Sequence, residues 1–598
     1  MKRKKLGALL MAGVMLMATV TGCGNNSNSG DTSGAGGSST ADQGSTAGDS
    51  GAAASGDDSQ QAAGSDKELM TIEIYDVAAN YQGLQTGWFD KVVKDRFNLE
   101  LNIIAPQVAG DAIFQTRAST GNLGDIVLLD STDFADCLSA GLIKDITGEI
   151  GNYSNLMTYK DQIDVFNKGL DGNSAGNIYG IPCQMTNTSP TTYSQDVIYS
   201  SPMLRWDLYK EVGEPEIADL DGLLDTLEKI KEVHPANESG DPAYPLSLWP
   251  DWDGGDGMIG IANVVQLTTW YGEKIKGSVI LKPDDTFVPL TDKDSTYYKM
   301  LKFLNDAYRR GLVDPDSGTQ TWDDVCSKIS AGQVDLLWYS WEVGFWNSLE
   351  RQQNGTAFIF IPVNDQNYYT DSDTYYGSGR VIGVGSQVDD AKYQRIMEFL
   401  DWYASPEGLV FQHAGIEGFN YTVGDDGKYT PINDNALMDN LPVPEEYGGG
   451  GYSDGNNAIN QWIVDATSTN PLTGETYAST YWASYKEATM TDMKREWQER
   501  FGAAEPVDYM EQNNVLLVSP NVSVSLPSDT PDISVIRNQV NQMVCDSSWK
   551  MIFAKDDAEF DQMWDTMSKD LDGVGFQDLV QFDIDKHTIE VNAKKAAK

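Results

Sequence analysis

The chain has 598 residues and a formal net charge of -47, with 42 lysines and arginines against 89 aspartates and glutamates. Nucleic acids and acidic membrane surfaces are also negatively charged. Electrostatic repulsion therefore excludes both as partners for binding through surface charge. The length is sufficient for two or three domains with substantial cores.

The N-terminus has the pattern of a secretory signal peptide over residues 1–22. A basic start at residues 2–5 precedes an apolar run that is too short to span a bilayer comfortably. VTGC then resembles a bacterial lipobox, so we expect Cys23 to be diacylated and to anchor the protein on the extracellular face of the cell membrane. The alternative is an ordinary signal peptide followed by a chance cysteine. Residues 23–67 contain almost only small and polar residues and predict a disordered tether.

Strand-like and helical patterns alternate in the first part of the remaining chain. Strands are predicted over residues 70–77, 99–105 and 125–130, with helices over 88–97 and 111–119 between them. A β-α-β-α-β order predicts a parallel sheet with helices on its faces. No glycine-rich phosphate loop interrupts it, which argues against a dinucleotide site.

The same alternation continues to the C-terminus. Ser405 followed by Pro406 marks a helix start, with the serine as N-cap. Apolar periodicity predicts helices over 220–230, 297–308 and 560–571, and strands over 334–339 and 357–363. We therefore predict an α/β protein that is too long for one sheet. Ligands of such sheets bind outside the carboxyl ends of the strands, so two facing lobes would form a cleft.

The segment LWPDWDGGDG at residues 248–257 places two tryptophans among acids and glycines. A pyranose stacks its apolar face on tryptophan and gives its hydroxyls to carboxylates, so Trp249, Trp252, Asp251 and Asp253 are candidate sugar contacts. The alternative is that one tryptophan covers its own lobe and the acids are merely solvated.

We expect no metal site in this protein. The acids of residues 248–257 do not fit an EF-hand, because Gly255 and Ala262 fall where that loop needs ligands. Residues 236–242 lack the regular oxygen ligands of a calcium loop. The cysteines at 137, 183, 326 and 545 have no metal-like spacing; they favour buried free thiols over two disulfides.

Five short motifs follow one another along the chain. They are GNLGD at 121–125, RWDL at 205–208, GLVDP at 311–315, SPEG at 405–408 and GIEGFNY at 415–421. In this order, after a lipobox, they resemble the family 1 extracellular solute-binding lipoproteins of bacterial carbohydrate ABC importers, in their large Gram-positive type.

The resemblance implies a two-lobed periplasmic-binding-protein fold (type II). Each lobe is expected to be a mainly parallel sheet flanked by helices, with extra helices at the C-terminus. One lobe is predicted at 68–190 plus 364–425, and the other at 191–363 plus 426–598. The chain is expected to be a monomer that captures an oligosaccharide and delivers it to the membrane permease subunits of an ABC importer.

The resemblance also suggests individual ligand contacts. Trp341 is the strongest, because maltose-type binding proteins commonly have a cleft-facing tryptophan after a strand and turn at this point. Asp125 is a candidate acceptor for sugar hydroxyls, with a helix cap or a salt bridge as the alternative. Glu417 and Asn420 lie near a predicted crossing between lobes, where they would support the hinge or touch ligand. Trp338 and Trp346 are expected in the core.

Two other functions remain as alternatives. A secreted glycoside hydrolase would also have an aromatic cleft and two catalytic carboxylates, but sequence spacing selects no pair among 89 acids. The three histidines are far apart and leave little for a triad. A peptide-binding protein on the same fold is the second alternative. We predict a binding protein with no cofactor and no catalytic residues.

Overall fold

A computed structural model describes residues 68–598, apart from Asp111, Asp171, Ser174, residues 256–257, residues 433–440 and Ser525. The predicted signal peptide, Cys23 and the predicted tether lie outside the described residues. Within the described part, no helix is both long enough and apolar enough to cross a membrane.

The first lobe is built on a six-stranded sheet in the order β2-β3-β1-β4-β13-β5. Its strands are β1 (Met70–Asp76), β2 (Gly83–Leu84), β3 (Leu99–Ile104), β4 (Ile126–Asp130), β5 (Gly180–Pro182) and β13 (Arg380–Val384). β1 runs parallel to β3 and β4, as the β-α-β-α-β pattern predicts. However, β13 runs antiparallel to both β4 and β5, and β2 antiparallel to β3. The expectation of a mainly parallel sheet is therefore wrong, because β13 enters from a distant part of the chain.

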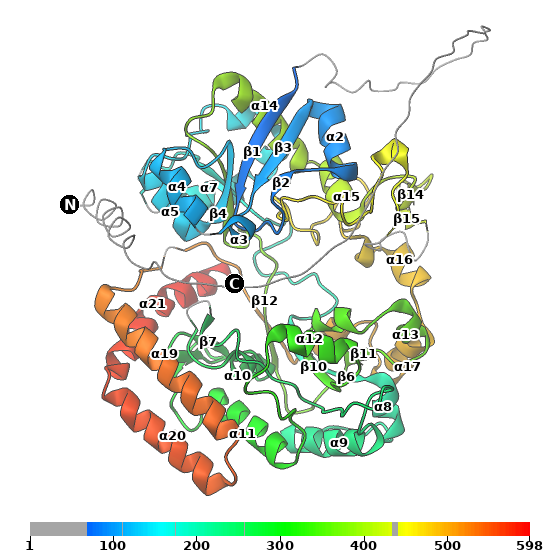
Figure 1. Cartoon of the computed structure of the whole chain (residues 1–598), viewed down its shortest axis with the longest axis vertical. Helices are drawn as coiled ribbons and strands as arrows, with labels where there is room; N and C mark the ends of the chain where they lie inside the picture. Colours follow the sequence, from blue (N-terminus) through cyan, green and yellow to red (C-terminus); the bar gives the residue numbers. More distant parts are fainter. Residues whose placement is uncertain are drawn as a thin grey trace, which may run out of the picture. The chain divides into compact units, whose positions relative to one another are not determined.

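Helices cover both faces of this sheet (Figure 1). They are α2 (Gly87–Phe97), α3 (Pro106–Ala109), α4 (Ala112–Ser119), α5 (Ser131–Ser139), α6 (Ser154–Met157), α7 (Lys160–Gly169), α14 (Asp390–Tyr403) and α15 (Pro406–Ala414). The strand alternation in β1 divides the core: Ile72 and Ile74 enter one apolar cluster and Tyr75 enters another. Ser405 caps α15 through the Gly408 N–H, as predicted.

The second lobe has its own core and a three-stranded sheet. β6 (Ser200–Arg205) lies between β10 (Leu336–Tyr339) and β11 (Phe358–Phe360), and both pairings are antiparallel. This sheet also departs from the parallel expectation. Long excursions join β6 to its neighbours, so no short β-α-β crossover fixes a parallel direction.

Helices and a small antiparallel sheet surround this second core. The helices are α8 (Trp206–Glu211), α9 (Leu220–Val233), α10 (Ala262–Leu267), α11 (Thr296–Arg309), α12 (Trp322–Ser330), α13 (Leu349–Gln353), α17 (Asp492–Phe501) and α18 (Pro506–Gln512). The small sheet contains β7 (Lys274–Lys276), β8 (Val279–Leu281) and β9 (Phe287–Pro289). The predicted apolar stripe of α9 is buried from Leu220 to Ile230.

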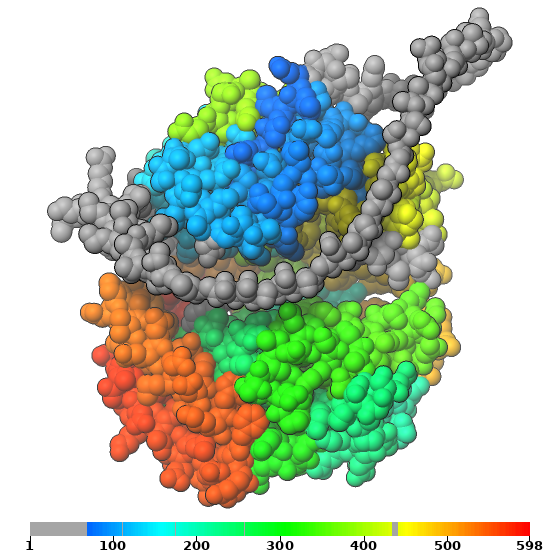
Figure 2. All heavy atoms as spheres, in the orientation of Figure 1, coloured from blue at the N-terminus to red at the C-terminus, as the bar shows by residue number. Residues whose placement is uncertain are grey.

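The expected C-terminal helices are present and extend the second core. They are α19 (Pro531–Ile552), α20 (Asp557–Asp572) and α21 (Phe576–Ala597). Their buried residues belong to the same apolar cluster as those of α9 and α11. Figure 2 shows these helices, in orange and red, packed against green segments of that lobe.

The chain stays in the first lobe for longer than predicted. After β14 (Tyr421–Val423) and β15 (Tyr429–Pro431), buried residues as far as Trp482 still belong to the first core. This corrects the assignment of residues 426–482 to the second lobe. The chain then passes through α16 (Ala483–Ala488) to the second core.

Two crossing segments are tied together by backbone pairing. β12 (Tyr368–Asp371), which follows β11, runs parallel to β16 (Leu516–Ser519). Asp373, just after β12, is buried and accepts hydrogen bonds from Thr188 and Ser194 of the earlier crossing. Segments far apart in sequence are therefore joined where the chain passes between cores.

Candidate functional site

A continuous aromatic cluster occupies one edge of the second lobe. Its members are Tyr199, Trp249, Trp252, Trp322, Trp338, Tyr339, Trp341 and Phe345, and each ring contacts at least one other. Tyr199 precedes β6 and Trp341 follows β10. Because these strands are antiparallel, the start of β6 lies beside the end of β10, and the two residues lie at the same end of the strands.

Part of this aromatic cluster is open to solvent. The exposed fractions of Tyr199, Phe345 and Trp341 are 55%, 39% and 37%. Trp252 and Trp322 are half-buried beside them. Large apolar rings gathered on a surface in this way are typical of interaction sites.

Trp249 behaves differently from its neighbour. Its ring is fully buried and stacks on Trp338 with centroids 5.7 Å apart. A ring without exposed surface cannot stack on a sugar, so the prediction of ligand contact by Trp249 is wrong. The Trp252 ring contacts the Trp249 ring edge-on, with centroids 5.2 Å apart, and is itself partly exposed to solvent.

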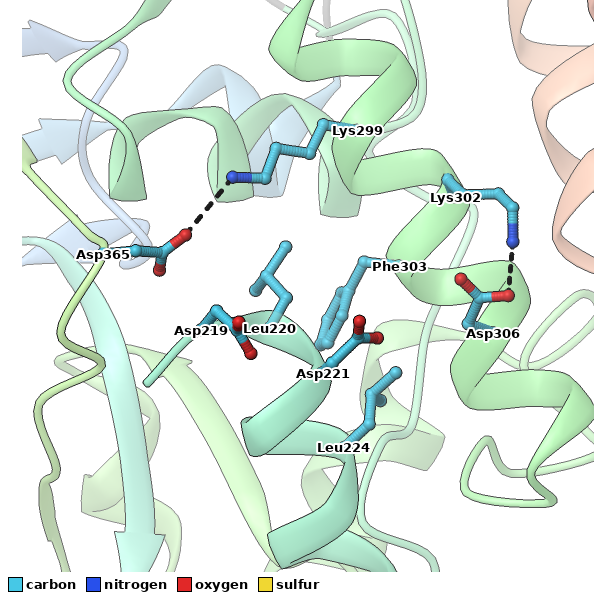
Figure 3. Close-up of a pocket in the computed structure, with 9 residues that line it drawn as sticks. All are labelled: Asp219, Leu220, Asp221, Leu224, Lys299, Lys302, Phe303, Asp306 and Asp365. Carbon is cyan, nitrogen blue, oxygen red and sulfur yellow. Dashed lines mark hydrogen bonds and ion pairs between the residues drawn. The ribbon is translucent and has the colours of Figure 1, made fainter. Parts of the chain in front are cut away.

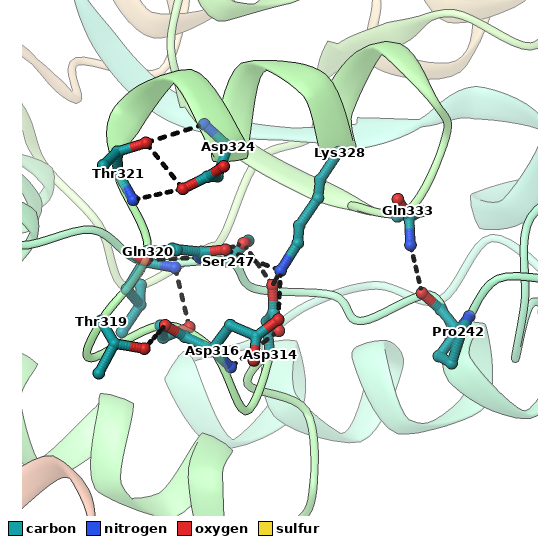
Figure 4. A network of polar contacts seen from close by, with 12 residues as sticks. Pro242, Ser247, Asp314, Asp316, Thr319, Gln320, Thr321, Asp324, Lys328 and Gln333 are labelled. Atoms are coloured by element: carbon teal, nitrogen blue, oxygen red, sulfur yellow. Dashed lines mark hydrogen bonds and ion pairs between the residues drawn. The ribbon is translucent and has the colours of Figure 1, made fainter. Parts of the chain in front are cut away.

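A buried polar network fixes the start of the tryptophan loop, which we define as residues 248–255. Gln320 donates to the Leu248 carbonyl at 2.7 Å and to the Ser247 hydroxyl at 2.8 Å. Lys328 donates to the Gln320 side chain and to Asp314, which accepts from Ser247 (Figure 4). The loop is therefore held firmly just before Trp249.

The two acids of the loop fasten it to neighbouring helices. Asp251 accepts the backbone N–H of Trp322, the first residue of α12, at 2.7 Å. Asp253 accepts from the Ala262 N–H at 2.9 Å and from the Trp549 indole at 2.6 Å. Burial raises the pKa of Asp253 to about 6, against the opposing effect of these two donors. Both carboxylates thus have protein partners and position Trp252 between them.

A buried glutamate shapes the turn that presents Trp341. Glu342 accepts the backbone N–H groups of Trp338 and Tyr339, each at 3.0 Å. Burial raises the pKa of this carboxyl to about 8, although both hydrogen bonds act in the opposite direction. The turn places the Trp341 ring on Tyr339, with centroids 5.3 Å apart.

The first lobe presents polar groups at the carboxyl ends of β1 and β4. Arg380, at the start of the antiparallel β13, pairs in register with Asp130 and lies 3.6 Å from its carboxylate. Arg380 also donates to the Gln461 side chain at 2.9 Å. Asp76, the last residue of β1, is fully buried, and burial raises its pKa to about 7. No motif in the sequence marks Asp76, Asp130 or Arg380 as a candidate.

Asp125 lies at the opposite end of β4 from Asp130. Its carboxylate accepts from Lys392 at 2.8 Å and from the Glu73 backbone N–H at 2.8 Å. The amino end of a strand faces away from the usual ligand-binding edge. The structure therefore supports the alternative interpretation of Asp125, a salt bridge, rather than ligand contact.

Glu417 and Asn420 do not lie at a crossing, because the chain remains in the first lobe until Trp482. Asn420 is fully buried and accepts the Ile416 N–H at 2.8 Å, so it holds its own turn. Glu417 is exposed beside it. The structure brings neither residue to the aromatic cluster.

A separate hollow of about 210 Å³ lies between α9 and α11. Figure 3 shows its two lysines turned toward carboxylates: Lys299 is 3.5 Å from Asp365, and Lys302 pairs with Asp306. Asp219 caps α9 through the Gly222 N–H. The charges of this hollow are thus engaged in structural pairs.

The four cysteines of the described region are free thiols, as favoured from the sequence. Burial raises the pKa of Cys137 and of Cys545 to about 12, which keeps both thiols protonated at neutral pH. Among the described residues, no group of three or more His, Cys, Asp and Glu side chains has a metal-binding arrangement.

Two α/β cores joined by several crossing segments define a two-lobed binding protein of the periplasmic-binding-protein type. The chain belongs to the bacterial extracellular solute-binding protein family, whose model matches residues 82–409, more than half of its length.

Solved structures share this fold at low sequence identity. One is the HMO-binding, ABC-transporter-associated solute-binding protein of Bifidobacterium longum infantis, with 15% identity and a TM-score of 0.54 over 88% of this chain and 99% of that chain. Another is the S. pneumoniae ABC-transporter substrate-binding protein FusA in complex with kestose, with 14% identity and a TM-score of 0.55 over 87% of this chain and 100% of that chain. No curated protein matches the chain.

Proposed function

We propose that the protein captures an oligosaccharide between its lobes, with Trp341 and Trp252 as the principal stacking rings. The observation that carries this proposal is the exposed part of the aromatic cluster at the edge of β6 and β10. Sugar rings have flat apolar faces that pack on such side chains. Tyr199, Trp322 and Phe345 extend the surface beyond one ring, which favours an oligosaccharide over a monosaccharide.

The first lobe would supply the polar part of the site. Asp130 and Arg380 lie at the edge from which β5 and β13 connect to the crossing segments, and Tyr199 lies where a crossing enters β6. A carboxylate can accept hydrogen bonds from sugar hydroxyls, and a guanidinium group can donate hydrogen bonds to them. Closure of the lobes would then enclose a sugar between rings and charges.

We propose further that the protein is a carrier rather than an enzyme, and that it delivers its ligand to the permease of an ABC importer. Membership of an extracellular solute-binding family supports this role. The N-terminal sequence supports export and a lipid anchor at Cys23. A carrier returns its ligand intact, so new reducing ends after incubation would favour the glycoside hydrolase alternative.

The test is a thermal-unfolding screen of residues 68–598 against oligosaccharides of α-glucan, β-glucan, xylan, mannan and fructan. A ligand at 100 times its Kd should raise the free energy of unfolding by about 2.7 kcal/mol. Tyr199→Ala should reduce the shift, while Tyr308→Ala, an exposed tyrosine on α11, should not. The proposal fails if no carbohydrate stabilises the protein, or if Tyr199→Ala and Trp341→Ala both bind as the wild type does.

A further inference from the structure

Helix α19, the first of the three C-terminal helices, contacts the tryptophan loop. Trp549 of α19 donates its indole N–H to Asp253 at 2.6 Å. The other oxygen of the same carboxylate accepts from Ala262 at the start of α10. One side chain of the loop is therefore held by two separate helices.

A second residue of α19 holds the loop backbone. Asn541 accepts the Gly260 N–H at 3.2 Å, and Gly260 in turn accepts the Gly254 N–H at 3.1 Å. Gly254 has a φ of 69°, and a Cβ added there would lie 1.8 Å from the Asn541 amide nitrogen. The left-handed backbone therefore favours glycine at 254, and a larger residue would also displace the Asn541 side chain.

We infer that Trp549 and Asn541 are positioning residues for Trp252, so that the C-terminal helices set ligand affinity without touching the ligand. Trp252 lies between Asp251, which is fixed to α12, and Asp253, which is fixed to α19. Its ring also contacts Trp322 and Trp341. This inference rests on the proposed function only for its statement about affinity.

The Trp549 hydrogen bond should affect the pH at which Asp253 is protonated. Burial raises the pKa of Asp253 to about 6, and the indole donor opposes this rise. The neighbouring titratable groups are Asp251 of the loop, Cys545 of α19 and Tyr297 of α11. Removing the donor should move the Asp253 transition to higher pH, because the charged form loses a partner.

The test uses protein labelled with 5-fluorotryptophan and does not need a ligand. The ¹⁹F resonance of Trp252, assigned by Trp252→Phe, should titrate with a midpoint near pH 6 in the wild type. Trp549→Phe keeps an aromatic ring but removes the indole N–H, so it should shift this resonance at pH 7 and raise its midpoint. Asp253→Asn should abolish the titration.

Trp564→Phe is the matched control. Trp564 is a buried tryptophan of α20 whose indole donates to the Thr291 carbonyl at 3.2 Å rather than to a residue of the loop. Its replacement should lower the unfolding midpoint and leave the Trp252 resonance unchanged. A Trp252 resonance that is the same in Trp549→Phe as in the wild type, or that moves equally in Trp564→Phe, would overturn the positioning role.

The effect on ligand affinity is measured with the oligosaccharide of the screening panel that gives the largest thermal shift. Trp549→Phe should weaken its binding about tenfold at pH 7, the loss expected for one charge-assisted hydrogen bond, with partial recovery at higher pH. Unchanged affinity despite a displaced Trp252 would overturn the claim that α19 sets affinity. A displaced Trp252 in a protein that binds no carbohydrate would support positioning and refute the proposed function instead.

Discussion

At the scale of single residues, Trp249 and Trp341 have opposite environments although both belong to one aromatic cluster. Trp249 is fully buried, and Trp341 is 37% exposed. A buried ring stabilises the fold through packing, and an exposed ring in a binding surface stabilises the complex. Substitution of each should therefore change a different measurement.

We expect Trp341→Ala to weaken oligosaccharide binding by at least about thirtyfold, because a well-buried aromatic anchor contributes about 2 kcal/mol or more to binding. Its unfolding midpoint should change little. Trp249→Ala should instead lower the free energy of unfolding by about 3–5 kcal/mol. Calorimetric titration and urea denaturation of both variants distinguish the two effects. Normal affinity in Trp341→Ala would mean that the ligand binds elsewhere.

Glu342 should make the stability of the protein depend on pH. Its pKa is about 8 in the folded protein, against an ordinary value of 4.5, because its carboxyl is buried. Between these values the folded state holds more protons than the unfolded chain, so the free energy of unfolding falls as the pH rises. The glutamine in Glu342→Gln does not titrate. From pH 5 to pH 8, the free energy of unfolding of this variant should therefore rise by at least about 1.4 kcal/mol relative to that of the wild type. The prediction is contradicted if urea denaturation gives the same difference in free energy of unfolding between the variant and the wild type at pH 5 and at pH 8.

At the scale of elements, the crossing segments depend on a few buried polar contacts. Asp373 accepts from the Ser194 hydroxyl at 2.6 Å and from Thr188 at 3.1 Å, which joins two segments that pass between the cores. Loss of this buried acceptor removes a hydrogen-bond partner from half-buried donors of Thr188 and Ser194. Such a loss is more costly than the loss of a solvated ion pair.

Asp373→Ala should therefore lower the free energy of unfolding by about 1–3 kcal/mol. The matched control is Asp95→Ala in α2, where the carboxylate is 53% exposed and pairs with Lys91 at 2.6 Å. That change should cost less than about 1 kcal/mol. Urea denaturation of the two variants gives the comparison, and equal losses would show that burial of Asp373 has no special role.

At the scale of the whole molecule, residues 68–598 supply the two apolar cores of the lobes. A tether rich in glycine, serine and alanine has nothing to bury. Anchoring and folding should therefore be separable properties of this protein.

Cys23→Ala should release the protein into the medium with an unchanged unfolding midpoint. Cell fractionation followed by thermal denaturation of the released protein tests both parts. The signal sequence remains intact in this variant, so export itself should continue. Retention of the variant in the membrane fraction would contradict a lipid anchor at Cys23.

The sequence by itself determined those features that depend on neighbours along the chain. The alternation of β1, the apolar stripe of α9 and the Ser405 cap are local patterns, and each formed where it was expected. The family motifs likewise identified a two-lobed binding protein. Trp252 is a candidate contact because of its acidic, glycine-rich segment, and Trp341 because of the family resemblance.

Only the tertiary structure decided which residues meet. Tyr199, Trp322 and Trp341 come from three distant segments, and no local period relates them. Burial separates Trp249 from Trp252, although only two residues lie between them, because Trp338 covers the first ring. The direction of β13 and the continuation of the first core as far as Trp482 depend on long-range contacts in the same way. Periodicity indicates which face of an element is apolar, whereas the partner that covers this face comes from elsewhere in the chain.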